Sequence, residues 1–183
     1  MMKEIRLHGR GGQGIVRAGE IIVAAVVNQG LFGNSIPYFG FERRGAPVSA
    51  FVRIDERPIR PKTQVYHPDC LIIMDDTIAN SVDIYEGIKD NCILVLNTKR
   101  KMEEIKVPTQ IKTIALLDAT GISLEILKRN IPNTAMLGAF ARATGWVDIN
   151  FLEEQVLKIF DEKNGEMLRR GYDMVEIFQV SEV

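Results

Sequence analysis

Residues 5–14 of the chain read IRLHGRGGQG, and residues 15–29 follow as a long apolar segment with almost no turn-forming residue. A short apolar run that enters a glycine-rich turn and then such a segment predicts a strand, a loop and a helix. Gly9, Gly11 and Gly14 have the G-x-G-x-x-G spacing, and Gly12 adds a fourth glycine. Glycine is required where φ is positive or where the backbone approaches a ligand or neighbour closely. This stretch predicts an α/β fold whose first turn has the form of an anion-binding site.

A dinucleotide site is one interpretation of this loop, which also contains Gln13. Such a site needs an Asp or Glu about 20 residues further on for the ribose hydroxyls, but residues 30–36 contain no acid. A phosphate-binding P-loop is excluded because Ile15 follows Gly14 where Lys is required. A turn that packs against a neighbouring element, with or without a bound anion, is the favoured interpretation. We expect Gly11 and Gly14 to tolerate a larger side chain less well than Gly9, because those two lie where turn and helix pack closely.

The composition is that of one soluble globular domain covering residues 1–183. Hydrophobic residues make up 46% and charged residues 26% of the chain, and the net charge is −1. Because the Lys and Arg residues are scattered, nucleic acid is not an expected partner. No apolar run reaches the length of a membrane span, and the N-terminus has no signal-peptide pattern. Cys70 and Cys92 have no metal-binding spacing and are expected to be buried thiols, so we expect a cytoplasmic protein.

The rest of the chain alternates strands and helices, which predicts a three-layer α/β/α, Rossmann-like fold with a mostly parallel sheet. Apolar runs without alternation suit parallel strands that are covered on both faces. The strands that we expect are 33–36, 49–54, 71–74, 92–96 and 112–117. The helices that we expect are 16–29, 79–89, 100–105, 122–129, 134–144, 150–162 and 165–178, with Asn133 and Asp148 as N-caps.

Polar residues follow several of these strands, at the sheet edge where open α/β proteins bind ligands. They are His8, Asp75 with Asp76, Asn97 with Thr98, and Asp118. The same residue types also cap the helix that follows a strand, so capping is the alternative explanation. We find no metal-binding cluster and no nucleophile–base pair, and we predict no catalytic residue on this chain.

The breaker-rich segment 37–47 carries aromatic and charged side chains together. Arginine's planar fork suits phosphates, carboxylates and protein interfaces, where Tyr, Phe and Arg are enriched. Solvated surface arginines are the alternative. Our candidates for interface or anion contacts are Tyr38, Phe39, Glu42, Arg43 and Arg44.

Four ordered motifs resemble the gamma subunits of 2-oxoacid:ferredoxin oxidoreductases. They are HGRGGQG (8–14), FGFERRGAPV (39–48), AFVRI (50–54) and NTAMLGA (133–139). The first two are more similar to the pyruvate or branched-chain branch than to the 2-oxoglutarate branch. Two departures from the pattern are Phe41, where the family usually has proline, and Asp76, where it usually has the proline of Asp-Pro-Thr.

The resemblance implies a non-catalytic subunit of an enzyme that oxidatively decarboxylates a 2-oxoacid with coenzyme A. It implies that thiamine diphosphate and iron–sulfur clusters are held by partner chains of alpha, beta and ferredoxin-like delta type. Coenzyme A would then lie near the subunit junction. A stand-alone nucleotide-dependent oxidoreductase and an anion-binding interaction module are the alternatives.

Overall fold

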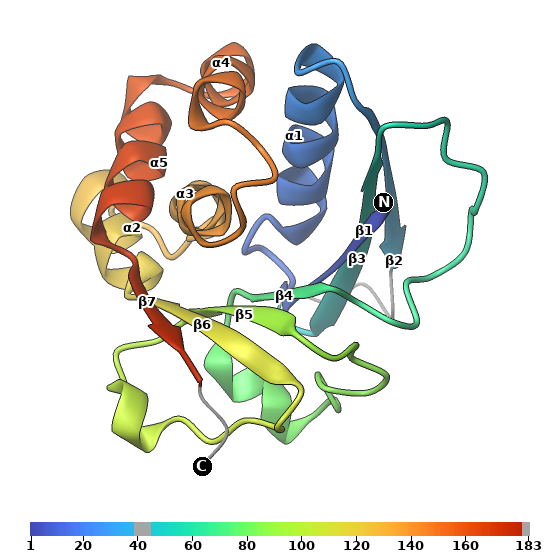
Figure 1. Cartoon of the computed structure of the whole chain (residues 1–183). Helices are drawn as coiled ribbons and strands as arrows, with labels where there is room; N and C mark the ends of the chain where they lie inside the picture. The colour runs from blue at the N-terminus through green and yellow to red at the C-terminus, as the bar shows by residue number, and fades with distance from the viewer. Residues whose placement is uncertain (39–44, 181–183) are drawn as a thin grey trace.

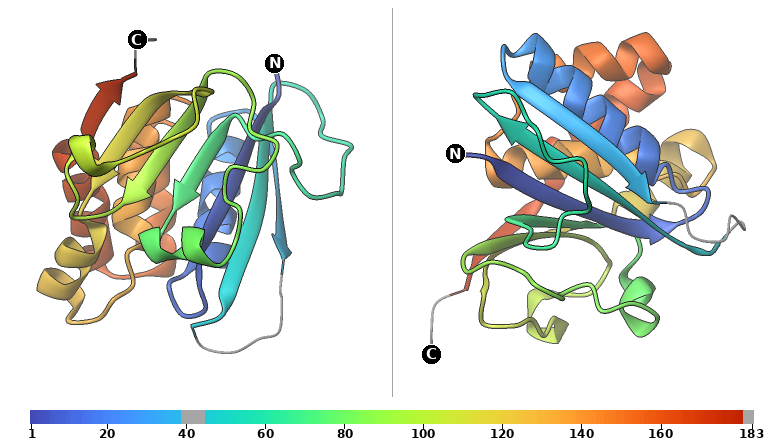
Figure 2. Two further views of the ribbon diagram at one scale, coloured as in Figure 1. Left: turned by 90° about the horizontal axis from the view of Figure 1, so that it is seen from below. Right: turned by 90° about the vertical axis from the view of Figure 1, so that its right-hand side faces the viewer.

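The computed structural model describes residues 1–38 and 45–180. Within these ranges the chain forms one seven-stranded sheet with the order β2-β3-β1-β4-β5-β6-β7. Figure 2 shows β2 and β7 at the two opposite edges of this sheet. The strands are β1 (Lys3–Arg10), β2 (Phe32–Tyr38), β3 (Pro47–Asp55), β4 (Cys70–Ile73), β5 (Cys92–Asn97), β6 (Ile111–Leu117) and β7 (Glu176–Gln179).

The sheet is mostly parallel, as predicted. β1, β4, β5 and β6 are parallel neighbours, whereas β3 and β7 run against them. β2 pairs antiparallel with β3 and therefore points the same way as β1. The chain builds β2 and β3 on one side of β1 and then crosses to build β4, β5 and β6 on the other. The boundary between β1 and β4 is thus the topological switch point, where open α/β sheets bind their ligands.

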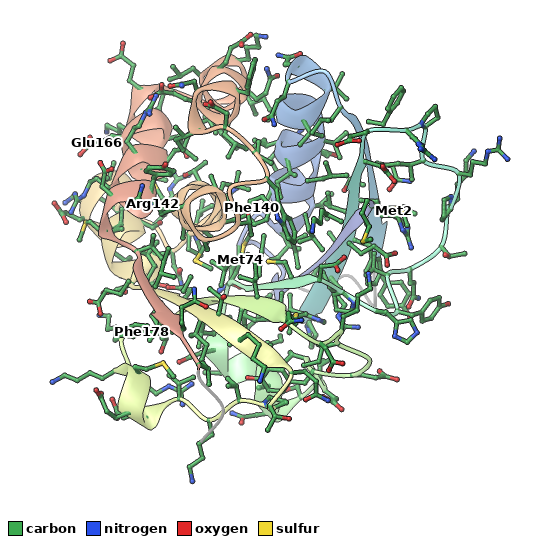
Figure 3. All side chains as sticks on the ribbon, viewed as in Figure 1. Met2, Met74, Phe140, Arg142, Glu166 and Phe178 are labelled. Atoms are coloured by element: carbon green, nitrogen blue, oxygen red, sulfur yellow. The ribbon has the colours of Figure 1, made fainter. Side chains whose placement is uncertain are left out.

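The α-helices cover one face of the sheet (Figure 1). They are α1 (Ile15–Asn28), α2 (Ala119–Leu127), α3 (Asn133–Thr144), α4 (Ile149–Ile159) and α5 (Glu162–Met174). A large apolar core fills the space between this helical layer and the sheet, and it includes Leu7, Ile21, Met74 and Phe140. Figure 3 shows Met74 and Phe140 in the interior and Glu166 on the outside.

The opposite face is covered by a thin layer, and here two helix predictions are wrong. Residues 79–89 and 100–105 do not form α-helices; the short 3₁₀ helices η1 (Asp76–Asn80) and η2 (Met102–Glu104) lie there instead. In the first segment the carbonyls of Ile84 and Glu86 accept hydrogen bonds from the buried Arg6 guanidinium, at 3.0 and 2.7 Å. Gly87 has a φ of +69°, and a Cβ there would lie 2.3 Å from the carbonyl oxygen of Tyr66. The carbonyls that a helix would use are therefore engaged by β1. A second apolar core, with Ile78, Leu94 and Ile105, lies beneath this layer.

The C-terminal part contains three helices where they were predicted, but with shifted ends, since α4 ends at Ile159 and α5 begins at Glu162. Asp148 caps α4 by accepting a hydrogen bond from the Asn150 amide at 2.7 Å. Asn133 is not an N-cap, because Pro132 occupies that position and Asn133 is the first helical residue. The helix predicted over 165–178 ends at Met174, and Glu176–Gln179 forms β7 instead, because it pairs with the free edge of β6.

The apolar first helix is explained by the chain's own fold. α1 packs on β1, β2 and β3 and contacts α3 and α4 on its other sides. Gly19 makes close contact with the sheet possible, because a Cβ there would lie 2.6 Å from Ser35 Oγ. The apolar residues of α1, including Ile21, Ile22 and Val26, are buried within the protein.

The crossing of α3 and α5 gives a prediction about stability. A Cβ on Gly138 would lie 2.0 Å from the carbonyl oxygen of Leu168, which is backbone and cannot rotate away. We expect Gly138→Ala to lower the free energy of unfolding by about 1–3 kcal/mol through overpacking, although alanine alone favours a helix by about 1 kcal/mol. Chemical denaturation measures this, with Glu166→Ala on the exposed face of α5 as the control. A variant as stable as the parent would mean that the two helices do not touch at Gly138.

Candidate functional site

The glycine loop lies between β1 and α1, as its sequence predicts. Gly12 and Gly14 have positive φ angles of +96° and +80°. A Cβ on Gly14 would lie 2.4 Å from Nδ2 of the buried Asn133, so this turn packs against the start of α3. Gly9 is also crowded: a Cβ there would lie 2.6 Å from Ile15 Cδ1 and 2.9 Å from Gln13 Oε1. Gly9 is therefore more constrained than the sequence suggests.

Three backbone amides of this loop donate hydrogen bonds within the protein. The Gly11 amide donates to the Ala46 carbonyl at 2.9 Å, and the Gln13 amide donates to the Arg10 carbonyl at 3.1 Å. The Arg10 amide donates to the Gln13 side-chain oxygen at 2.7 Å. A phosphate cradle needs such N–H groups to point at the ligand. The Arg10, Gly11 and Gln13 amides are therefore engaged within the protein and do not point at a ligand.

The Asp75 carboxylate adds a negative charge beside this loop. It follows β4 and accepts a hydrogen bond from Gln13 Nε2 at 3.2 Å, and Arg10 Nε lies 3.3 Å from it. Partial burial by itself raises the pKa of Asp75, but hydrogen bonds from Thr77 and Gln13 and the charge of Arg10 outweigh it. The net pKa is lowered, so the group is ionised at neutral pH. A dinucleotide pyrophosphate at this turn would meet a fixed carboxylate, which argues against the nucleotide interpretation.

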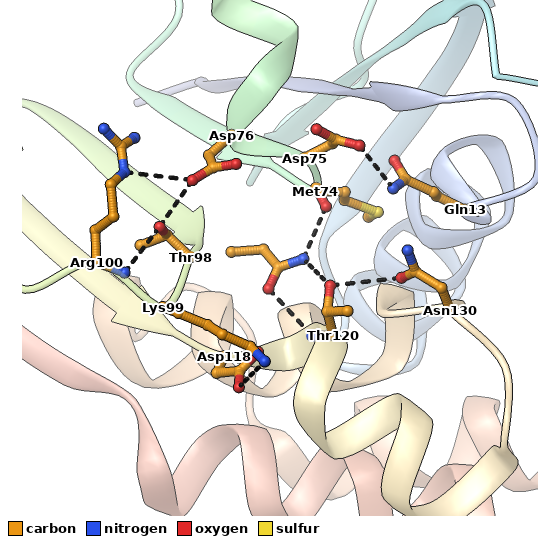
Figure 4. Close-up of a pocket in the computed structure, with 11 residues that line it drawn as sticks. Gln13, Met74, Asp75, Asp76, Thr98, Lys99, Arg100, Asp118, Thr120 and Asn130 are labelled. Atoms are coloured by element: carbon orange, nitrogen blue, oxygen red, sulfur yellow. Dashed lines mark hydrogen bonds and ion pairs between the residues drawn. The ribbon is translucent and has the colours of Figure 1, made fainter.

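A polar pocket of about 230 Å³ lies next to this loop, at the carboxyl ends of β4, β5 and β6 (Figure 4). The predicted strand-end residues Asp75, Asp76, Asn97, Thr98 and Asp118 all line it. His8 does not. Its Nδ1 lies 3.0 Å from Ser49 Oγ, and burial, with a contribution from the Arg6 charge, lowers its pKa to about 4.

Asn97 connects three of the pocket's walls. Its Nδ2 donates to the Met74 carbonyl and to Thr120 Oγ1, both at 2.8 Å, and its Oδ1 accepts from the Thr120 amide at 3.1 Å. Asn130 extends the network through Thr120, with 3.4 Å between Oδ1 and Oγ1. Thr120 and Asn130 were not predicted as site residues, since neither directly follows a strand.

The carboxylates of the pocket are each paired with a cation. Arg10 lies beside Asp75, Arg100 Nε lies 3.4 Å from Asp76, and Lys99 Nζ lies 3.7 Å from Asp118. Asp118 also caps α2, since its Oδ1 accepts from the Gly121 amide at 2.8 Å. Asp75 likewise caps η1 through the Thr77 amide at 3.0 Å. Capping and pocket lining, the two sequence interpretations, are thus both satisfied by the same side chains.

The aromatic–arginine candidates are only partly visible in this structure. Tyr38 ends β2 with 52% of its surface exposed, and its ring contacts Phe51 edge-on at 6.3 Å. Phe39, Glu42, Arg43 and Arg44 lie outside the described residues. In the described part of the chain, no group of three or more His, Cys, Asp or Glu side chains is placed to hold a metal ion. None of the described helices is long and apolar enough to cross a membrane.

Fold and pocket together define an open α/β protein with a glycine turn after β1 and a polar, charge-balanced pocket at the carboxyl ends of β4, β5 and β6. Residues 4–174 match the family model for pyruvate ferredoxin/flavodoxin oxidoreductase, and the chain belongs to that family. The chain is 45% identical to the gamma subunit common to the pyruvate and ketoisovalerate oxidoreductases of Pyrococcus furiosus, over 98% of this chain and 100% of that one.

Two further comparisons agree with this family. The gamma subunit of the NADH-dependent phenylglyoxylate dehydrogenase of Aromatoleum evansii is also 45% identical, over 98% of this chain and 97% of that one. The crystal structure of the pyruvate oxidoreductase subunit PORC of Thermotoga maritima superimposes with a TM-score of 0.85 at 36% identity, covering 97% of this chain and 99% of that chain. The resemblance inferred from the four motifs is confirmed.

The link between Asp75 and its partners gives a pH-dependent prediction. Because the folded-state pKa of Asp75 is below its usual 3.8, the carboxylate stabilises the fold above that pH. This contribution is lost as the pH falls through the lowered pKa. We expect Asp75→Asn to be at most about 1 kcal/mol less stable at pH 7, through weaker bonds to Arg10 and Thr77 that solvent partly screens, and the difference to shrink below pH 3.8. Denaturation at several pH values measures this, with the exposed Asp90→Asn as the control. A pH-independent difference would assign the loss to packing.

Proposed function

We propose that this chain is the gamma subunit of a multi-subunit 2-oxoacid:ferredoxin oxidoreductase of the pyruvate type. The complex would oxidatively decarboxylate a 2-oxoacid with coenzyme A, giving an acyl-CoA, CO₂ and reduced ferredoxin. The observation that carries this proposal is the 45% identity to a gamma subunit along the full length of both chains. We place the complex in the cytoplasm on the composition of the sequence.

The chemistry of the chain supports a non-catalytic role. A cubane iron–sulfur cluster needs four thiolates, and the sequence has two cysteines, both fully buried. Burial raises the pKa of the Cys70 thiol, and it raises that of Cys92 to about 12. Such thiols are poor metal ligands and poor nucleophiles. We therefore assign thiamine diphosphate and the iron–sulfur clusters to partner subunits of alpha, beta and delta type.

We do not specify the 2-oxoacid substrate beyond the pyruvate-type branch of the family. Relatives at equal identity carry different substrate names, pyruvate with ketoisovalerate in one and phenylglyoxylate in the other. The gamma chain thus tolerates different 2-oxoacids in the complex. This agrees with a subunit that does not itself form the substrate pocket.

The stand-alone nucleotide-dependent enzyme is the less favoured alternative. Its binding loop would have to give up the internal bonds of Gly11 and Gln13 and accept a phosphate beside Asp75. An anion-binding interaction module meets the same obstacle. Co-expression with the partner subunits separates these possibilities: a stable complex that reduces ferredoxin with pyruvate supports the proposal. A monomer that binds NADH at the glycine loop would contradict it.

The arginine pair gives a quantitative prediction for that complex. We expect Arg43→Ala, Arg44→Ala to leave the melting temperature of the isolated chain unchanged. Either assembly or the apparent affinity for coenzyme A should fall by at least about tenfold, because truncating a desolvated charged contact costs about 2–5 kcal/mol. Reconstitution followed by pyruvate-dependent ferredoxin reduction across coenzyme A concentrations measures both. The matched control is Arg57→Ala, Arg60→Ala, two exposed arginines with the same change of charge. If the two double variants behave alike, Arg43 and Arg44 are solvated surface arginines without a role in assembly or coenzyme A binding.

A further inference from the structure

A further pocket lies on the thinly covered face of the sheet and is lined by residues of both η1 and η2. Its volume is about 460 Å³. The floor is apolar, because the buried side chains of Ile84, Leu96 and Ile105 line it. The rim is polar and includes Tyr85 and Arg100. A pocket of this size, with an apolar floor and a few polar groups, has the properties of a small-molecule site.

Arg100 is held in place at the boundary between this pocket and the polar pocket at the strand ends, since it lines both. Its Nε lies 3.4 Å from an Asp76 carboxylate oxygen, and its amide donates to Thr98 Oγ1 at 3.1 Å. Thr98 Oγ1 donates to the same Asp76 oxygen at 2.8 Å, and Figure 4 shows these contacts. A proline at position 76, which the family usually has, could not make them. The orientation of Arg100 is therefore a feature of this chain.

Hydrogen-bond donors of Arg100 and Tyr85 remain available at the pocket. Among residues 1–38 and 45–180, no hydrogen bond or ion pair engages the two terminal nitrogens of Arg100 or the Tyr85 hydroxyl. Burial raises the pKa of Tyr85 above its usual 10, and the nearby Arg100 charge opposes this shift only in part. The hydroxyl is therefore protonated at neutral pH and can donate a hydrogen bond.

These donors match a carboxylate in number and geometry. The two terminal nitrogens of a guanidinium can donate parallel hydrogen bonds to both oxygens of a carboxylate, and the Tyr85 hydroxyl can donate a third. The other charged residues of the lining are Asp76, Glu104 and Lys106, so with Arg100 the four charges cancel. A ligand with one negative charge is thus favoured over a phosphate with two, which both carboxylates would repel. The apolar floor would contact a hydrocarbon group attached to the carboxylate.

We propose that this pocket binds a monocarboxylate that carries a small apolar group. The carboxylate contacts the terminal nitrogens of Arg100 and the Tyr85 hydroxyl, and the apolar group lies on the floor of the pocket. The site goes beyond the proposed function and does not rest on it, because this chain alone forms it. A surface arginine without a ligand is the alternative, since 49% of the Arg100 side chain is exposed.

Titration of the isolated chain with 3-methylbutanoate, followed by NMR, tests the site. We expect saturable shifts of the backbone amide signals of Tyr85, Leu96 and Ile105, which line the pocket. Acetate lacks the apolar group, and 3-methylbutanamide lacks the charge. Each should bind at least about tenfold more weakly, because burial of three carbon groups or a charged hydrogen bond is lost.

Variants of the pocket separate a built site from a surface arginine. Arg100→Met should weaken binding of 3-methylbutanoate by at least about tenfold, and Tyr85→Phe by about fivefold. Arg57→Met removes an exposed arginine that does not line the pocket, and it should bind like the parent. Ala79→Phe fills the pocket from its exposed rim without a change of charge, and it should abolish saturation.

Three results would overturn the site. They are the absence of saturation with 3-methylbutanoate, an equal affinity for the amide, and an unchanged affinity in Arg100→Met or in Ala79→Phe. Each would identify Arg100 as a surface arginine. The proposed function would stand in every case, because assembly with the partner subunits is measured separately.

Discussion

The structure depends on the closure of the glycine loop by Gln13, Arg10 and Asp75. Gln13 accepts from the Arg10 amide and donates to Asp75, and the Arg10 side chain pairs with the same carboxylate. These contacts bring the end of β1 to the end of β4 across the switch point. In a dinucleotide-binding protein this place is left open for a pyrophosphate. Here the side chains of Gln13 and Arg10 contact Asp75 at this place, so the turn acts as a structural joint between the ends of β1 and β4.

The two faces of the sheet are covered differently. All α-helices of the described chain lie on one face, so the other face carries only η1, η2 and loops over a smaller core. The polar pocket at the strand ends is charge-balanced, since Asp75, Asp76 and Asp118 each face a cation.

Much of the fold is predictable because its strands are short apolar runs that end in a polar residue. β4, β5 and β6 were placed to within one or two residues, and the polar residues after them do line one pocket. The failures have a common cause in tertiary contacts. Residues 79–89 have a helical pattern, but Arg6 on a distant strand takes their carbonyls. Residues 175–178 look helical until the free edge of β6 offers a partner. Thr120 and Asn130 carry no sequence signal, because Asn97 recruits them across the fold.

The most direct measurement is residue-resolved amide hydrogen exchange on the isolated chain by NMR. If the glycine loop is a closed joint, the Arg10 and Gly11 amides are held by Gln13 and Ala46 and should exchange as slowly as amides in the central strands. Their protection should be unaffected by NADH. Fast exchange at both amides, with protection appearing only when NADH is added, would show an open anion site and would contradict the central claim.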